Sequence, residues 1–154
     1  VMHLAARVMK SLGDPARPAW KWSEKPGEPP ESRAHLLTHD PDRYADEMWW
    51  RQARPELVMG PGSWAWVERA YASMRGLFAP GKLEAVKVPV LILVTDNDKL
   101  VGYSAIARAA QRLTNVELVR FSKEAHHEIL READPVRDRA LAAADAFLAR
   151  IAGK

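Results

Sequence analysis

The feature that most limits the possible folds is the run VPVLILVT at residues 88–95, in which nearly every side chain is β-branched or aliphatic. A run without polar alternation is typical of a strand buried on both faces of a parallel sheet, with Pro89 near its start. A strand this apolar needs neighbours, because an open edge pairs with other chains. The chain is therefore expected to contribute to a sheet with covered faces.

The residues after this run predict a βαβ unit. A helix is expected at 104–113, and the alternating run VELVRF predicts a second strand at 116–121. Such a unit is parallel and right-handed. Asp134 and Pro135 predict the cap of a last helix that reaches about Ala152. Two parallel strands do not make a stable sheet alone, and no comparable strand precedes them, so the chain is predicted to be part of a larger sheet protein.

The first half of the chain differs in composition. All six tryptophans and eight of the eleven prolines precede residue 67, and five of these prolines predict irregular chain at 14–32. Asp40 is the expected N-cap of a helix that ends near Arg54. Ser63 is the expected N-cap of another, which carries an apolar stripe at helical spacing and stops at Pro80 and Gly81. The stripe consists of Trp66, Ala70, Met74 and Leu77.

Composition excludes several classes of protein. The 154 residues suffice for one domain, and 47% hydrophobic with 28% charged residues are ordinary globular values. The absence of cysteine excludes disulfides, thiolate metal sites and cysteine nucleophiles. The net charge of +3 is spread along the chain, so no nucleic-acid partner is expected. No membrane span or export signal is predicted; we expect a cytoplasmic protein, with attachment to a membrane surface as the alternative.

Candidate chemistry lies where the two predicted strands end. The first strand runs into Asp96 and Asp98, and the second is followed by His126 and His127. Functional groups of parallel sheets gather at the carboxyl ends of the strands, and neighbouring strands lie about 4.8 Å apart. An acid and a histidine on these loops can form the orienting half of a nucleophilic triad.

Four blocks of the sequence together resemble a known family. They are LLTHDPDRY at 36–44, GPGSWAW at 60–66, VPVLILVTDNDKLV at 88–101 and AHHEILRE at 125–132. In this order they look like the C-terminal half of an α/β-hydrolase, and most resemble the lysophospholipase and monoacylglycerol lipase group. The resemblance covers essentially the whole chain. It implies a mostly helical cap at residues 1–84, followed at 85–154 by the last two strands and helices of the core.

Position by position, the resemblance makes Asp98 the triad acid and His127 the general base. Asp96 and Glu124 stand where the family usually has glycine, and Asp96 and His126 are the alternative acid and base. The family's serine lies in a G-x-S-x-G elbow that this sequence lacks. Ser104 follows a loop and is better explained as a helix N-cap, and Ser63 also opens a helix, so neither is predicted to be the nucleophile.

Metal ligation is not predicted. A zinc-binding helix that starts at His127 needs a second histidine where Arg131 stands. His35 and His39 are four residues apart beside Asp40, but the resemblance places them in a turn of the cap. No cofactor is implied. The tryptophans of the cap are expected mostly to pack internally, with Trp64 lining an acyl pocket.

The sequence therefore predicts part of a serine hydrolase that cleaves lipid-like esters, such as lysophospholipids or monoacylglycerols. Its partner is the missing N-terminal half of the core, on the same or another chain, and this chain alone is predicted to be inactive. One alternative is a non-catalytic binding module that pairs through its sheet edge. Another is a hydrolase-fold thioesterase or epoxide hydrolase.

Overall fold

The computed structural model describes residues 2–21 and 33–153, so that Trp22 and most of the proline-rich run lie outside the described residues. The described residues form two compact units. The first lies within Val1–Glu31 and Trp50–Lys82, and the second within Ser32–Trp49 and Leu83–Lys154. The second unit therefore joins residues 32–49 to the strands.

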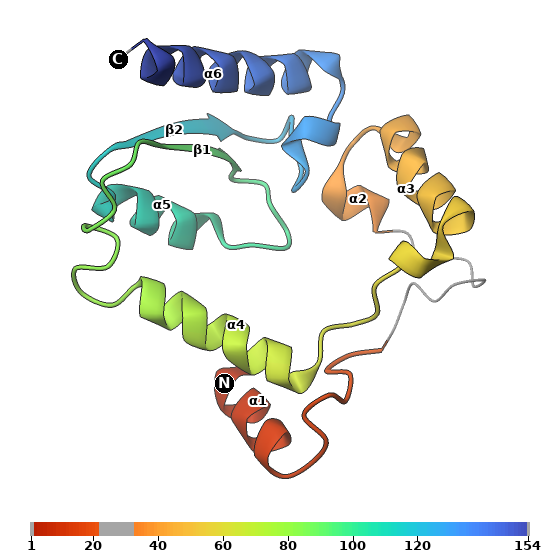
Figure 1. The fold of residues 1–154 in the computed structure, drawn as a ribbon. Coiled ribbons are helices and arrows are strands. Elements are labelled where there is room, and N and C mark those ends of the chain that lie inside the picture. Colours follow the sequence, from red (N-terminus) through yellow and green to blue (C-terminus); the bar gives the residue numbers. More distant parts are fainter. Residues whose placement is uncertain (1, 22–32, 154) are drawn as a thin grey trace. The chain divides into compact units, whose positions relative to one another are not determined.

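The second unit contains the predicted βαβ arrangement (Figure 1). Strands β1 (Val90–Thr95) and β2 (Val116–Phe121) are parallel, with partners from Val90↔Val116 to Thr95↔Phe121. Helix α5 (Tyr103–Arg112) connects them, and α6 (Asp134–Ala152) lies on the opposite side of the sheet. This confirms the mixed α/β class and the parallel connection.

The core of this unit lies where β2 and the chain after it meet α6. Its buried residues are Phe121, Ala125, Ile129 and Ala140. Strand β1 differs from the expectation of burial on both faces, because only Val94 and Thr95 are buried and the four residues before them are half-buried. In the described residues β1 pairs with β2 alone, so its other edge has no strand against it.

Helix α2 (Ala34–Leu37) and most of α3 (Pro41–Ala53) precede the strands in this unit, and the 3₁₀ turn η2 (Ile129–Arg131) follows β2. The 3₁₀ turn η1 (Pro55–Leu57) follows α3 and belongs to the first unit. Asp40 caps α3 as predicted, since its Oδ1 accepts hydrogen bonds of 3.1 Å from the backbone N–H groups of Asp42 and Arg43. Pro55 lies just beyond the last turn of α3.

Two predicted helix caps are wrong. Ser104 lies inside α5, whose N-cap is Gly102, because the Gly102 carbonyl already accepts a 2.9 Å hydrogen bond from the Ala105 N–H. Asp134 is the first residue of α6, and its N-cap is Ala133. The Asp134 carboxylate instead pairs with arginine side chains, of which Arg137 lies 3.0 Å away.

The first unit is a pair of helices, α1 (Met2–Ser11) and α4 (Trp64–Leu77). Ser63 caps α4 as predicted and accepts a 3.2 Å hydrogen bond from the Trp66 N–H. Helix α1 was not predicted, and it decides which face of α4 is covered: Val67 is buried, as is Ala6 of α1. The predicted apolar stripe of α4 is mostly exposed instead, at Trp66, Met74 and Leu77.

Gly62 lets two tryptophans approach the turn before α4. A Cβ atom at this position would lie 2.8 Å from Trp20 Cη2 and 2.8 Å from Trp66 Cε3. The two indole rings meet edge to face, with centroids 6.3 Å apart. Only glycine fits this turn without moving an indole ring.

The tryptophans are less buried than expected, since Trp20, Trp49, Trp50 and Trp66 are all exposed.

Candidate active site

The carboxyl ends of β1 and β2 meet as expected of neighbouring parallel strands. Thr95 pairs with Phe121 at the last register position, and the Asp96 N–H donates a 3.0 Å hydrogen bond to the Phe121 carbonyl. Both strands are followed by loops at this end of the sheet. The loop after β1 leads to Asp98, and the loop after β2 leads to His127.

Asp98 and His127 form a hydrogen-bonded pair between these loops. Nδ1 of His127 lies 2.8 Å from Oδ2 of Asp98. The other carboxylate oxygen, Oδ1, accepts backbone hydrogen bonds of 2.7 Å from Leu100 and 3.0 Å from Val101. The Asp98 side chain is 6% exposed and that of His127 is 36% exposed. The carboxylate is thus held by its own loop, and the imidazole it orients is open to solvent.

The pKa of the Asp98 carboxyl is lowered in the folded chain. Burial alone would raise this pKa, but the hydrogen bond from His127 and those from the backbone N–H groups of Val101 and Leu100 favour the charged form and outweigh it. Asp98 is therefore a carboxylate at neutral pH. A carboxylate at Nδ1 favours the tautomer with the proton on Nδ1, which leaves Nε2 as the acceptor nitrogen.

Asp96, the alternative acid, has other partners. Its Oδ2 accepts hydrogen bonds from the Arg120 guanidinium, at 2.7 Å from Nε, and from Ser122 Oγ at 3.0 Å. The hydrogen bond from Arg120 is the largest cause that lowers the pKa of Asp96. The geometry therefore pairs Asp98, and not Asp96, with a histidine.

The buried hydroxyl of Thr95 joins the two loops below this pair. Thr95 is 1% exposed, and its Oγ1 lies 2.8 Å from the Ala125 carbonyl and 3.1 Å from the Ser122 carbonyl. The same oxygen accepts a 3.1 Å hydrogen bond from the Asn97 N–H. Through this residue, the loop after β1 is tied to the segment that leads to His127.

The segment after His127 is tied to the region around α2. The backbone N–H of Glu128 donates a 2.8 Å hydrogen bond to the Leu37 carbonyl. The hydroxyl of Thr38 donates to the Arg131 carbonyl at 2.8 Å. These bonds explain why residues 32–49 group with the strands.

Glu132 is a buried residue of this region that sequence reasoning missed. It is 1% exposed, and its carboxylate accepts backbone hydrogen bonds of 2.6 Å from His126 and 3.0 Å from His39. His126, the alternative base, stacks on the ring of His39 with centroids 3.7 Å apart. No local pattern signals this cluster, because Glu132 and His39 are 93 positions apart.

The remaining predicted residues lie elsewhere. Trp64, the expected acyl-pocket residue, belongs to the first unit and is half-buried at the start of α4. Among residues 2–21 and 33–153, no serine hydrogen-bonds to His127: Ser63 caps α4, and Ser122 donates to Asp96. In the part of the chain described, the Asp98–His127 pair thus has no serine hydrogen-bonded to its imidazole.

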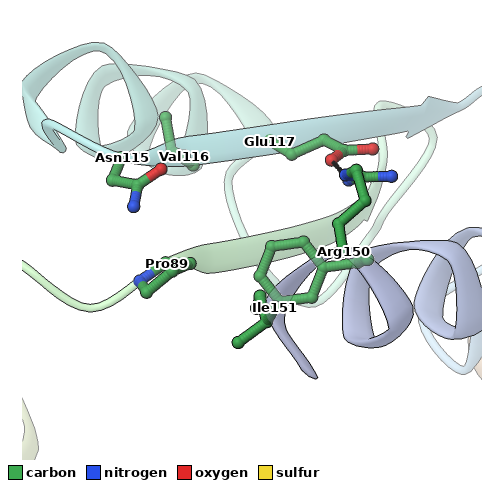
Figure 2. A pocket seen from close by; sticks show the side chains of 7 residues that line it. Pro89, Asn115, Val116, Glu117, Arg150 and Ile151 are labelled. Atoms are coloured by element: carbon green, nitrogen blue, oxygen red, sulfur yellow. Dashed lines mark hydrogen bonds and ion pairs between the residues drawn. The ribbon is translucent and has the colours of Figure 1, made fainter. Parts of the chain in front are cut away.

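A hollow in the second unit lies at the opposite end of the sheet (Figure 2). Its volume is about 320 Å³, and it is lined by Pro89, Asn115, Val116, Glu117, Phe147, Arg150 and Ile151. Figure 2 shows Glu117 paired with Arg150 across part of it. Pro89 and Val116 lie at the amino ends of the strands, so this hollow does not serve the Asp98–His127 pair.

No family model matches this chain, and no curated protein matches it. Solved structures do match. A soluble variant of the monoglyceride lipase of Saccharomyces cerevisiae, in complex with a substrate analog, has a TM-score of 0.66 at 15% identity. The monoacylglycerol lipase of Paleococcus ferrophilus has a TM-score of 0.67 at 21% identity. Each match covers 96% of this chain, but only 48% and 51% of the respective lipase.

At these identities the likeness concerns the fold. The chain has a fold similar to about half of each of these two structures, in agreement with the partial α/β-hydrolase fold that the resemblance implied. Among the described residues, no helix combines the length and apolar character needed to cross a bilayer.

Proposed function

We propose that this chain supplies the acid and the base of a Ser-His-Asp triad in an α/β-hydrolase that cleaves lipid-like carboxylic esters. The observation that supports the proposal best is the 2.8 Å contact between His127 Nδ1 and Asp98 Oδ2 at the carboxyl ends of two neighbouring parallel strands. The fold shared with two monoacylglycerol lipases supports monoacylglycerols as substrates, and lysophospholipids follow from the sequence resemblance alone.

In the proposed mechanism, Nε2 of His127 takes the proton of a serine hydroxyl as that oxygen attacks the ester carbonyl. His127 then returns the proton to the leaving alcohol, and Asp98 stabilises the imidazolium that forms in between. The acyl group remains on the serine oxygen. A water molecule, which gives a proton to His127, then attacks this acyl-serine; the acid is released and the serine oxygen regains the proton. The serine and its G-x-S-x-G elbow lie outside residues 1–154, in an N-terminal half of the core on the same or another chain.

In this proposal residues 1–84 are the cap region of the hydrolase and residues 85–154 are part of its core. Trp64 and the exposed apolar stripe of α4 are apolar surface suited to an acyl chain. The alternative is a non-catalytic module. It is favoured by one observation, the edge of β1 that lacks a paired strand in the part of the chain described.

Hydrolysis of 4-nitrophenyl butyrate and of a monoacylglycerol tests the proposal. Residues 1–154 alone should hydrolyse neither, whereas the chain combined with the half that carries the serine elbow should hydrolyse both and be inactivated by a fluorophosphonate. Turnover by residues 1–154 that survives the fluorophosphonate would refute the triad. If the combined protein cleaves only thioesters or only epoxides, that class replaces lipid-like carboxylic esters as the proposed substrate.

A further inference from the structure

We propose that His39, His126 and Glu132 form a binding site for a divalent transition-metal ion of the zinc type. One ligand atom from each of these residues lies within 4.8 Å of the others. Two imidazoles and one carboxylate are a donor set that suits Zn²⁺, whereas Mg²⁺ and Ca²⁺ prefer oxygen ligands. The site is distinct from the Asp98–His127 pair and does not depend on the proposed hydrolase activity.

The separation of His39 and Glu132 already fits a shared ion. Nδ1 of His39 lies 3.1 Å from Oε1 and 3.2 Å from Oε2 of Glu132. Two ligands of a tetrahedral zinc ion, each bonded at about 2.0–2.1 Å, are separated by roughly 3.4 Å. An ion can thus replace the proton between this nitrogen and the carboxylate at close to their present separation.

His126 supplies an independent sign of a missing ligand. Its Nδ1 is buried and has no hydrogen-bond partner among the described residues. A buried polar atom without a partner is destabilising, so a ligand that pairs with it is favoured. His126 stacks on His39 with an interplanar angle of 26°, so ligation by both rings requires that the rings turn. The His39 side chain is 44% exposed and has room to do so.

The surroundings of Glu132 resemble the outer shell of a metal site. The backbone N–H groups of His126 and His39 donate to its two oxygens, and Thr38 Oγ1 lies 3.3 Å from Oε2. Such bonds hold a ligating carboxylate in one orientation. The exposed side of His39 provides a path for the ion. A bound ion would cross-link His39 to residues 126–132, the segment that contains His126 and Glu132.

Titration of the full chain with Zn²⁺, followed by calorimetry, tests the site. We expect saturable binding of one ion, a higher melting temperature with Zn²⁺, and slower amide hydrogen exchange at residues 36–40. His39→Ala and His126→Ala should each weaken binding at least tenfold and abolish both other effects. His35→Ala is the matched control for a surface histidine and should bind as the wild type does.

Co²⁺ provides a spectroscopic check of the ligands. Its visible absorption bands should report a four-coordinate site in the wild type and be lost in His39→Ala. Because Glu132→Gln removes a buried carboxylate that accepts several hydrogen bonds, its folding is checked by circular dichroism, and the histidine variants carry the test if it unfolds. Absence of saturable Zn²⁺ binding, equal binding by His39→Ala, or equal binding of Mg²⁺ would overturn the proposal.

Discussion

The imidazole of His127 is hydrogen-bonded to the carboxylate of Asp98, a residue 29 positions earlier in the chain. The contact exists because β1 and β2 are neighbours and parallel, which brings the loops that follow them to one edge of the sheet. Backbone hydrogen bonds to Oδ1 hold the carboxylate, so its Oδ2 is directed at Nδ1. The arrangement favours one tautomer of His127, and the proposed mechanism depends on that tautomer.

If the proposed function holds, replacement of Asp98 by asparagine should abolish most activity of the complete proposed hydrolase without unfolding it. The amide retains an acceptor for the backbone but cannot stabilise an imidazolium, and we expect kcat to fall by about 10³–10⁴-fold. Asp96→Asn is the matched control, because Asp96 bonds to Arg120 and Ser122, and it should alter kcat by less than about tenfold. Similar losses in both variants would contradict the assignment of the acid.

Local sequence patterns were sufficient to predict the two strands that position Asp98 and His127, and one helix before them. The apolar run at 88–95, the alternating run at 116–121 and the Asp40 cap each act within a few residues, and the structure has a strand, a strand and a capped helix there. The likeness to half of a lipase fold agrees with the incomplete sheet inferred from β1.

Contacts between distant parts of the chain could not be predicted in this way. Glu132 is buried and hydrogen-bonded to His39, which is 93 positions away, and no spacing in the sequence links the two residues. Helix α1 covers the Val67 face of α4, so the stripe through Trp66 and Leu77 is left exposed. Spacing identified the apolar residues of α4, but the position of its neighbour decides which of them are buried.

The stability contributed by Asp98 should depend on pH. Burial opposes ionisation, but the hydrogen bonds from His127, Val101 and Leu100 prevail, and the pKa of Asp98 is lower in the folded than in the unfolded chain. A lowered pKa stabilises the folded state above the unfolded pKa, and this stability is lost as the pH falls through the folded pKa. The unfolded pKa is about 3.9, so the loss falls at and below about pH 4.

Urea denaturation of the wild type and of Asp98→Asn at several pH values measures this effect. The pH runs from about 2.5 to about 6, which spans the range in which a carboxyl group ordinarily titrates. The difference in free energy of unfolding should be largest at the upper end and narrow as the solution is acidified. A difference that stays constant, or widens in acid, would show that the hydrogen bonds to Asp98 do not favour its charged form.

Thr95→Val should destabilise the second unit. The substitution keeps the shape of the side chain but removes the hydroxyl, which leaves the buried Ala125 carbonyl without that donor and the Asn97 N–H without that acceptor. We expect a loss of about 1–3 kcal/mol in the free energy of unfolding. Thr114→Val is the control, because Thr114 is exposed and water can replace its bond to the Val86 carbonyl; its effect should stay within about 0.5 kcal/mol. Equal effects would mean that Thr95 does not tie the two loops.

Two glycine-to-alanine substitutions in the first unit should have opposite effects. At Gly62 the new methyl group would meet Trp20 Cη2 and Trp66 Cε3 at 2.8 Å, so one indole must move, and we expect destabilisation of about 1–3 kcal/mol. Gly76 lies in α4, where a methyl group would have no atom within 4 Å apart from the backbone of its own helix, and Gly76→Ala should stabilise the helix by about 0.5–1 kcal/mol. Thermal unfolding measures both, and near-ultraviolet circular dichroism reports the Trp20–Trp66 contact. That signal should change in Gly62→Ala alone; an unchanged signal and stability there would show that the two rings do not enclose this turn.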